Sequence, residues 1–145
     1  MPKFKLVIDT STLIAAWISS QPSYTKDLLQ IATTGYVNFY MSAETFEELQ
    51  EVSHRDYVIK SLKQRKILLA KLLSDYSEMC EWIDDLPSVS ICREPKDNKF
   101  LALSEAVNAD FLVTVDKDLL DLKKHQQTLI LRPSQAWEKI NKNLK

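Results

Sequence analysis

The stretch FKLVIDTSTLIAAW, residues 4–17, places a carboxylate inside apolar sequence. Residues 4–8 are typical of a buried β-strand, and Leu13, Ile14 and Trp17 follow at helical spacing. Asp9 stands between the predicted strand and helix. Burying an unpaired carboxylate costs on the order of several kcal/mol of free energy, because the charge loses its hydration. Asp9 must therefore have a partner, or the strand ends there and Asp9 points into a site.

The pattern of a strand followed by a helix continues along the whole chain. Further strands are predicted at residues 37–41, 89–92, 111–115 and 128–131. Helices are predicted near 23–34, 43–53, 98–108 and 117–122, in two pieces over 55–80 with a break near 63–65, and after Pro133. Such alternation indicates an α/β fold built from βαβ units around a parallel sheet.

Length and charge are those of one ordinary globular domain. The chain has 145 residues, 45% of them hydrophobic, and a formal net charge of −1. This charge argues against a general nucleic-acid coat protein, which would be strongly basic, but leaves room for an enzyme with a local patch or a metal. Two cysteines, Cys80 and Cys92, predict reduced thiols in a cytoplasmic protein. No apolar run reaches 18 residues, so no membrane span is expected.

The chain contains a single glycine, Gly35. A P-loop needs at least two glycines, a dinucleotide-binding fingerprint needs three, and a nucleophile elbow needs two. These nucleotide-cradling and hydrolase loops are therefore excluded. The chemistry must rest on side chains, and Gly35 itself suits the end of the helix that precedes it.

Four acidic residues occupy comparable positions around the predicted sheet. Asp9 follows the first strand, Asp116 follows the fourth, Asp97 begins a helix, and Glu48 lies in the helix after the second strand. Functional groups gather at the carboxyl edge of a parallel sheet, where the strand order reverses. If strands one and four are neighbours, Asp9 and Asp116 stand side by side. Oxygen ligands of this kind suit Mg²⁺ or Mn²⁺.

Each of these acids also has a purely structural interpretation. Asp9 and Asp97 are favoured helix N-caps, and Asp116 could serve a loop or a cap. Glu48 could lie on a solvated helix face, where periodicity alone does not separate it from Glu44, Glu47 and Glu51. One shared acidic site explains all four positions more economically than four separate structural roles.

Four stretches carry a resemblance to a known family: VIDTSTLI, SAETFEELQEV, CREPKDNKFLALSEAVNADFLVTVDKDLL and ILRPSQAW. They resemble a PIN domain of the kind found in bacterial toxin–antitoxin ribonucleases, the VapC-like type. The likeness extends over nearly the whole chain. It implies a single domain over residues 1–145, a three-layer α/β/α sandwich whose central parallel sheet has about five strands.

The resemblance implies an endonuclease of single-stranded RNA that depends on Mg²⁺ or Mn²⁺. Its catalytic and metal-binding acids map onto Asp9, Glu48, Asp97 and Asp116, and Glu48 is chosen because the family's acid directly precedes a leucine, here Leu49. Supporting positions around these ligands map onto Ser11, Thr114 and Asp118.

The chain departs from the family pattern at three positions. Ser11 stands where asparagine is common, Val115 where glycine is common, and Glu94 where aspartate is frequent. Ser11 can still donate a hydrogen bond to a carboxylate, although over a shorter reach, and Val115 predicts a tighter backbone before Asp116. None of the three departures removes one of the four acids, so an active enzyme remains the favoured interpretation.

The expected partners are RNA and protein. RNA contacts are expected from Arg93, Lys96 and Lys99 around Asp97, and from Lys117 after Asp116. A second basic stretch over residues 60–66 either faces RNA or is a solvated helix face. The family implies a small antitoxin protein as partner and a homodimer.

The expected reaction is metal-assisted hydrolysis of a phosphodiester. A phosphatase with an aspartyl nucleophile also begins with an acid at a strand end, but it needs a second aspartate where Ser11 stands. A catalytically inert PIN module that binds RNA or a protein partner is the remaining alternative, and the four intact acids argue against it.

Overall fold

The computed structural model describes residues 3–144. Its sheet has the strand order β3-β2-β1-β4-β6-β5, in which all neighbours are parallel except β5 and β6. The strands are β1 Phe4–Ile8, β2 Val37–Met41, β3 Glu81–Trp82, β4 Phe111–Val113, β5 Lys124–His125 and β6 Thr128–Leu131. The predicted α/β class and central parallel sheet are confirmed, and the observed sheet adds one antiparallel edge strand, β5, to the predicted pattern.

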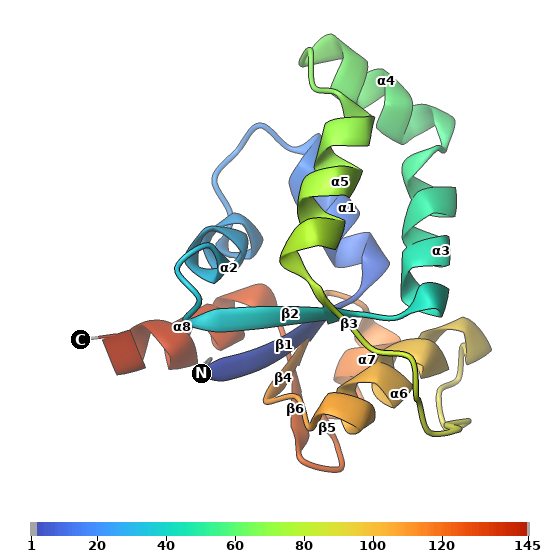
Figure 1. The fold of residues 1–145 in the computed structure, drawn as a ribbon, viewed down its shortest axis with the longest axis vertical. Helices are drawn as coiled ribbons and strands as arrows, with labels where there is room; N and C mark the ends of the chain where they lie inside the picture. Colours follow the sequence, from blue (N-terminus) through green and yellow to red (C-terminus); the bar gives the residue numbers. More distant parts are fainter. Residues whose placement is uncertain (1–2, 145) are drawn as a thin grey trace.

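Helices cover both faces of this sheet (Figure 1). The helices are α1 Thr10–Ile18, α2 Tyr24–Ala32, α3 Ala43–Ser53, α4 Asp56–Gln64, α5 Leu69–Met79, α6 Asn98–Val107, α7 Lys117–Leu120 and α8 Pro133–Leu144, with a short 3-10 turn η1 at Pro95–Asp97. Within residues 3–144, no helix is long and apolar enough to cross a bilayer.

Two separate cores follow from the alternation of side chains along β1. Leu6 and Ile8 point into one core, which contains buried residues of α1, α2, α3, α4, α5 and α8. Val7 points to the opposite face, where it packs with Leu101 of α6 and Leu119 of α7. Alternate residues of one strand thus bury apolar surface on both sides, as expected for a sheet between two helical layers.

The predicted strand at residues 89–92 is wrong. The third strand is instead the two-residue β3, which pairs with β2 through Tyr40 and Glu81. The backbone N–H groups of Ile91 and Cys92 donate to Asn98 Oδ1 at 3.1 and 2.9 Å, so a side chain takes the place of a neighbouring strand. An apolar run alone does not reveal such a partner.

Strand β5 was not predicted. It forms a short antiparallel hairpin with β6 across Gln126, which has a φ of 54°. This turn carries none of the Asn-Gly or Asp-Gly signals of a tight hairpin.

The predicted division of residues 55–80 into two helices is confirmed, because α4 ends at Gln64 and Lys66 takes a φ of 56° before α5 begins.

The order of the strands sets up the site. β1 lies between β2 and β4, so the chain order reverses at the β1–β4 pair, where Ile8 is in register with Val113. The residues that follow these two partners are Asp9 and Thr114. The prediction that the first strand and the strand at residue 111 are neighbours is confirmed.

Candidate acidic active site

Asp9 caps α1 at the end of β1. Its backbone N–H donates to Val113 O at 3.2 Å, and its Oδ1 accepts from the Thr12 N–H at 3.2 Å. The side chain is only 3% exposed. The structural interpretation of Asp9 as an N-cap is therefore correct, but one cap hydrogen bond leaves the other oxygen, Oδ2, to be used elsewhere.

Thr114 links Asp9 to Asp116. Its hydroxyl donates to Asp9 Oδ2 at 2.7 Å and accepts from the Asp116 N–H at 2.9 Å. Asp116 is the N-cap of α7, and its Oδ1 accepts a hydrogen bond from the Asp118 N–H at 3.0 Å. One buried threonine thus positions a carboxylate from β1 and the backbone that carries a second one.

Asp97 brings a third carboxylate to the same place. It ends the turn η1 and precedes α6, but its side chain makes no capping hydrogen bond. The residue is 5% exposed, and Oδ2 is buried without a hydrogen-bond partner among the described residues. Burial, then the Asp116 and Asp9 carboxylates, raise the pKa of Asp97 to about 7, against the opposing effect of Lys96.

The three carboxylates of Asp9, Asp97 and Asp116 line one cleft and influence one another's ionisation. Burial raises the pKa of Asp9, and the Asp116 carboxylate adds to the effect, while hydrogen bonds from Thr12 and Thr114 oppose it. Burial followed by Asp97 and Asp116 raises the pKa of the Cys92 thiol to about 11. We call Asp9, Asp97 and Asp116 the acidic trio.

Glu48 lies in the same cleft but is held differently. Its Oε2 accepts from the Thr10 hydroxyl at 2.6 Å, and its Oε1 accepts from Lys99 Nζ at 3.1 Å. The side chains of Glu48 and Lys99 are 15% and 17% exposed. The fourth predicted acid is thus present with a cationic partner from α6.

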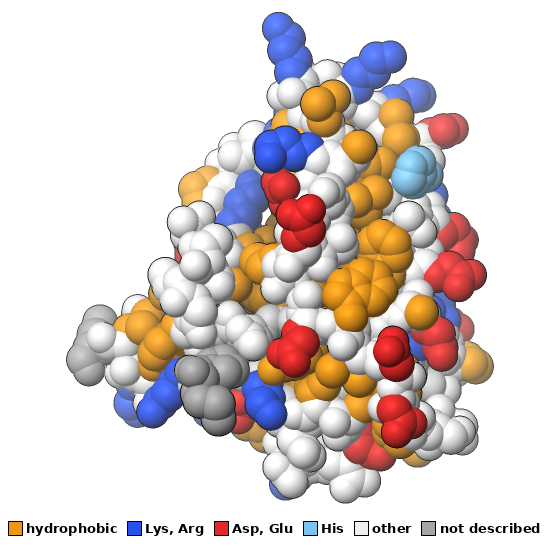
Figure 2. All heavy atoms as spheres, in the orientation of Figure 1, with side chains coloured by type: hydrophobic (Ala, Val, Ile, Leu, Met, Phe, Trp, Pro, Cys, Tyr) orange, Lys and Arg blue, Asp and Glu red, His pale blue; other side chains and the backbone are white. Residues whose placement is uncertain are grey.

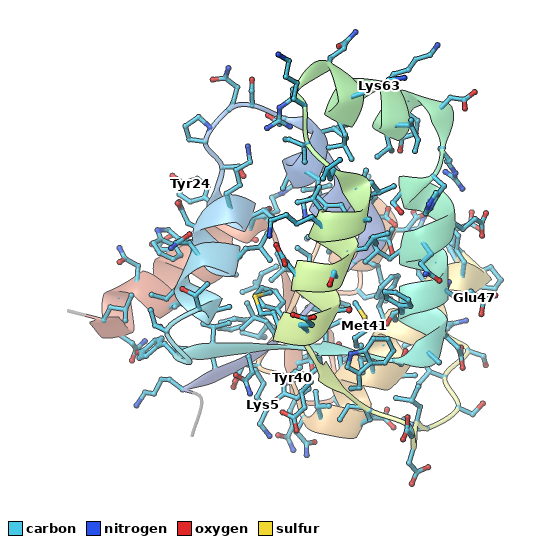
Figure 3. All side chains as sticks on the ribbon, turned by 45° about the horizontal axis from the view of Figure 1, so that its top comes forward. Lys5, Tyr24, Tyr40, Met41, Glu47 and Lys63 are labelled. Carbon is cyan, nitrogen blue, oxygen red and sulfur yellow. The ribbon has the colours of Figure 1, made fainter. Side chains whose placement is uncertain are left out.

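Burial separates Glu48 from its neighbours on α3, which periodicity did not. A capping box formed by Ser42 and Thr45 fixes the start of this helix. Glu48 is half-buried, whereas three exposed acids share the cleft wall: Glu44, Glu47 and Glu51. Glu47 lies on the side of α3 that faces away from α5 (Figure 3). Acidic side chains line the edge of the molecule where α3 runs (Figure 2).

The supporting residues differ in how closely they engage the acids. Ser11 Oγ reaches Asp9 Oδ2 only at 3.4 Å, in line with its short side chain. The Asp118 carboxylate faces Arg93 at 3.5 Å rather than the trio. Val115 is accommodated without positive φ, and its N–H donates to Thr12 Oγ1 at 3.0 Å. Thr12 is a supporting residue that the sequence did not single out.

The four predicted RNA-binding cations have different surroundings. Arg93 and Lys117 both pair with Asp121, whose pKa is lowered by hydrogen bonds from Lys117 and Arg93. Lys99 is paired with Glu48. Lys96 lines the cleft and has no salt-bridge partner within residues 3–144. Of the basic residues at the end of α4, Lys63 points outward (Figure 3), whereas Arg65 turns inward and donates to Trp17 O, and neither lines the cleft.

The donor set of the trio suits a hard cation. Carboxylate oxygens are the ligands that Mg²⁺ and Mn²⁺ prefer, and the partnerless Oδ2 of Asp97 is a buried acceptor that such a cation would satisfy. In the described part of the chain, no three His, Cys, Asp or Glu side chains already form a complete metal-binding group. A bound ion would therefore have to draw the trio closer together.

The cleft itself has a volume of about 570 Å³. It begins at the trio, runs between α1 and α3 past Glu48 and Lys99, and reaches Arg55 and Tyr57 at the start of α4. Three carboxylates thus lie beside a cleft at the carboxyl edge of the parallel sheet, where the strand order reverses between β1 and β4. This arrangement defines an α/β protein with an acidic site.

Comparison with known proteins identifies the family. The sequence model of the PIN domain family matches residues 5–118, so the chain belongs to the PIN domain family. The chain is also 30% identical over 132 residues to the uncharacterized protein MJ1680 of Methanocaldococcus jannaschii, an alignment that covers 88% of this chain and 80% of the relative. PIN domains are generally nucleases and typically use divalent metal ions. The extent of the domain over residues 1–145 stays a prediction.

Proposed function

We propose that this protein is a metal-dependent endoribonuclease that cleaves single-stranded RNA. The observation that carries the proposal is the convergence of the acidic trio, in which Asp97 keeps a buried oxygen without a partner. Maintaining like charges in a buried site is unfavourable unless a cation compensates them. Membership of a family of nucleases supplies the class of reaction.

In this proposal Asp9, Asp97 and Asp116 hold Mg²⁺ or Mn²⁺, with Glu48 as a fourth carboxylate beside them. The ion supplies positive charge at the scissile phosphate. Thr114 and Thr12 fix the positions of Asp9 and of the chain before Asp116. Lys96, at the cleft beside Asp97, attracts the phosphate of the substrate.

The biological setting is part of the same proposal. We place the protein in the cytoplasm as the toxin of a toxin–antitoxin pair, acting as a homodimer with a small antitoxin as partner. The sequence resemblance to toxin ribonucleases supports this role, and two free cysteines, one of them buried, suit a reducing compartment.

One observation favours a second candidate, the inert PIN module that binds RNA or protein without cleaving it. The Lys99 ammonium already neutralises the negative charge of Glu48 in an ion pair. Such a pair is expected in a protein in which Glu48 no longer binds a metal ion. Titration of the purified protein with Mn²⁺ in a calorimeter separates the candidates, because the inert module would bind no ion.

The proposal is tested by incubating the protein with a labelled single-stranded RNA in Mn²⁺ or in excess EDTA. Endonucleolytic fragments are expected with Mn²⁺ and none with EDTA. Fragments that persist undiminished in EDTA would overturn the metal-dependent reaction. Mn²⁺ binding without any cleavage of RNA would leave a metal site with a different substrate.

A further inference from the structure

The cleft continues well beyond the acidic trio. Its far end lies where α3 passes into α4 and is lined by Val52, Arg55 and Tyr57, with Ile18 of α1 opposite them. A volume of about 570 Å³ falls in the range of clefts that enclose small organic ligands, about 300–1,000 Å³. The cleft therefore has room for more than a metal ion and one phosphate.

Tyr57 is an exposed aromatic residue on a well-anchored helix. It lies in the first turn of α4 and is 53% exposed. Two hydrogen bonds tie this helix to the end of α1, from Ser61 Oγ to Ile18 O at 3.1 Å and from Arg65 Nη1 to Trp17 O at 2.6 Å. The phenol ring is thus presented to the cleft from a fixed backbone.

The chemistry around Tyr57 suits a flat, uncharged group better than a phosphate. Ile18 and Val52 supply apolar surface, and the acids of α3 repel a phosphate backbone on this side. Within residues 3–144, the Arg55 guanidinium has one ion pair, an exposed contact with Glu51 at 3.8 Å, which leaves it free to rearrange. Aromatic and arginine side chains are the usual stacking partners of unpaired bases.

We propose that Tyr57, assisted by Arg55, forms a stacking site for one unpaired nucleobase of the RNA strand whose phosphate lies at the acidic trio. This inference rests on the proposed function, because the same cleft must hold the reacting phosphate. The two ends of the cleft would then bind different parts of the RNA. Lys96 and the acidic trio bind the phosphate, and the junction of α3 and α4 binds the base.

Tyr57→Ala tests the site by fluorescence anisotropy with a fluorescein-labelled single-stranded RNA of about 12 nucleotides, in EDTA so that nothing is cleaved. Loss of one stacked base should raise the Kd roughly 5- to 100-fold. The slope of log Kd against log salt should stay unchanged, since no phosphate contact is lost. Tyr57→Phe should bind as the wild type does, and Tyr57→Leu, which keeps apolar bulk without a ring, should bind as weakly as Tyr57→Ala.

Tyr24 provides a matched control. It is 51% exposed, begins α2 and does not line the cleft, and it lies across α5 from α3 (Figure 3). Tyr24→Ala should leave RNA affinity unchanged. Equal affinities of Tyr57→Ala, Tyr24→Ala and wild type would overturn the stacking site, and continued cleavage by these proteins would show that the proposed nuclease function survives. A wild type that neither binds nor cleaves RNA in Mn²⁺ would overturn both.

Discussion

The Thr114 hydroxyl donates a 2.7 Å hydrogen bond to Asp9 Oδ2 across 105 positions of sequence. Both residues are buried, Thr114 completely and Asp9 to 3% exposure. The same hydroxyl accepts from the Asp116 N–H, so its single proton is committed to Asp9. This bond joins the ends of the two strands where the sheet reverses, and it aligns the loop that carries Asp116.

Thr114→Val should therefore destabilise the protein by about 1–3 kcal/mol, because Asp9 Oδ2 loses its donor in a buried site. Thr114→Ser keeps the hydroxyl and should cost much less. Urea denaturation of the metal-free proteins measures the difference. A Thr114→Val protein that is as stable as the wild type would show that this hydrogen bond contributes nothing to stability.

Asp97→Asn should stabilise the metal-free protein at and above neutral pH by about 1 kcal/mol once solvent screening is allowed for. The change removes one of three like charges and keeps the shape of the side chain, and no capping hydrogen bond is lost. Thermal melting in EDTA measures the effect. If this variant melts well below wild type, Asp97 has a structural role that the site does not explain.

The stability of the metal-free wild type should also depend on pH in a defined direction. The folded protein raises the pKa of Asp97 from 3.8 to about 7, so between these values the folded state binds a proton that the unfolded state releases. The contribution of this group to the free energy of unfolding is largest below the lower value, falls as pH rises and levels off above about 7. Asp97→Asn should lack this component, which is visible as a flatter curve of stability against pH.

Lys99→Met should destabilise the protein by about 1–3 kcal/mol, because it leaves the half-buried Glu48 carboxylate without its cation. Lys96→Met is the matched control, since Lys96 has no ion pair within residues 3–144. Its effect should stay within about 0.5 kcal/mol. Similar losses for both lysines in urea denaturation would show that the Lys99–Glu48 pair contributes nothing specific.

Much of this architecture could be predicted because it follows from local patterns. The strand–acid–helix order around Asp9 and the alternation of elements gave the α/β class, and the strand reversal brought Asp116 beside Asp9 as expected. The strand expected at residues 89–92 failed because the Asn98 side chain binds that backbone. A partner of this kind depends on tertiary contacts and leaves no mark in an apolar run.

The site could be predicted in composition but not in detail. The sequence supplied the acids, yet no spacing rule shows that Lys99, expected to contact RNA, pairs with Glu48 across α3 and α6. The sequence likewise gave no reason to select Tyr57 as an RNA-binding residue, because its place at the end of the cleft depends on how α4 packs on α1. Pairings between helices far apart in sequence are decided by packing, which one sequence does not display.

RNA cleavage by Asp9→Asn and Glu44→Gln, compared in Mn²⁺ with the wild type, tests the acidic trio most directly. Both variants remove one carboxylate charge from the same cleft, but only Asp9 belongs to the trio. Asp9→Asn should abolish cleavage, and Glu44→Gln should cleave at close to the wild-type rate. Asp9→Asn that still cleaves RNA as the wild type does, or equal loss in both variants, would contradict a reaction centred on Asp9, Asp97 and Asp116.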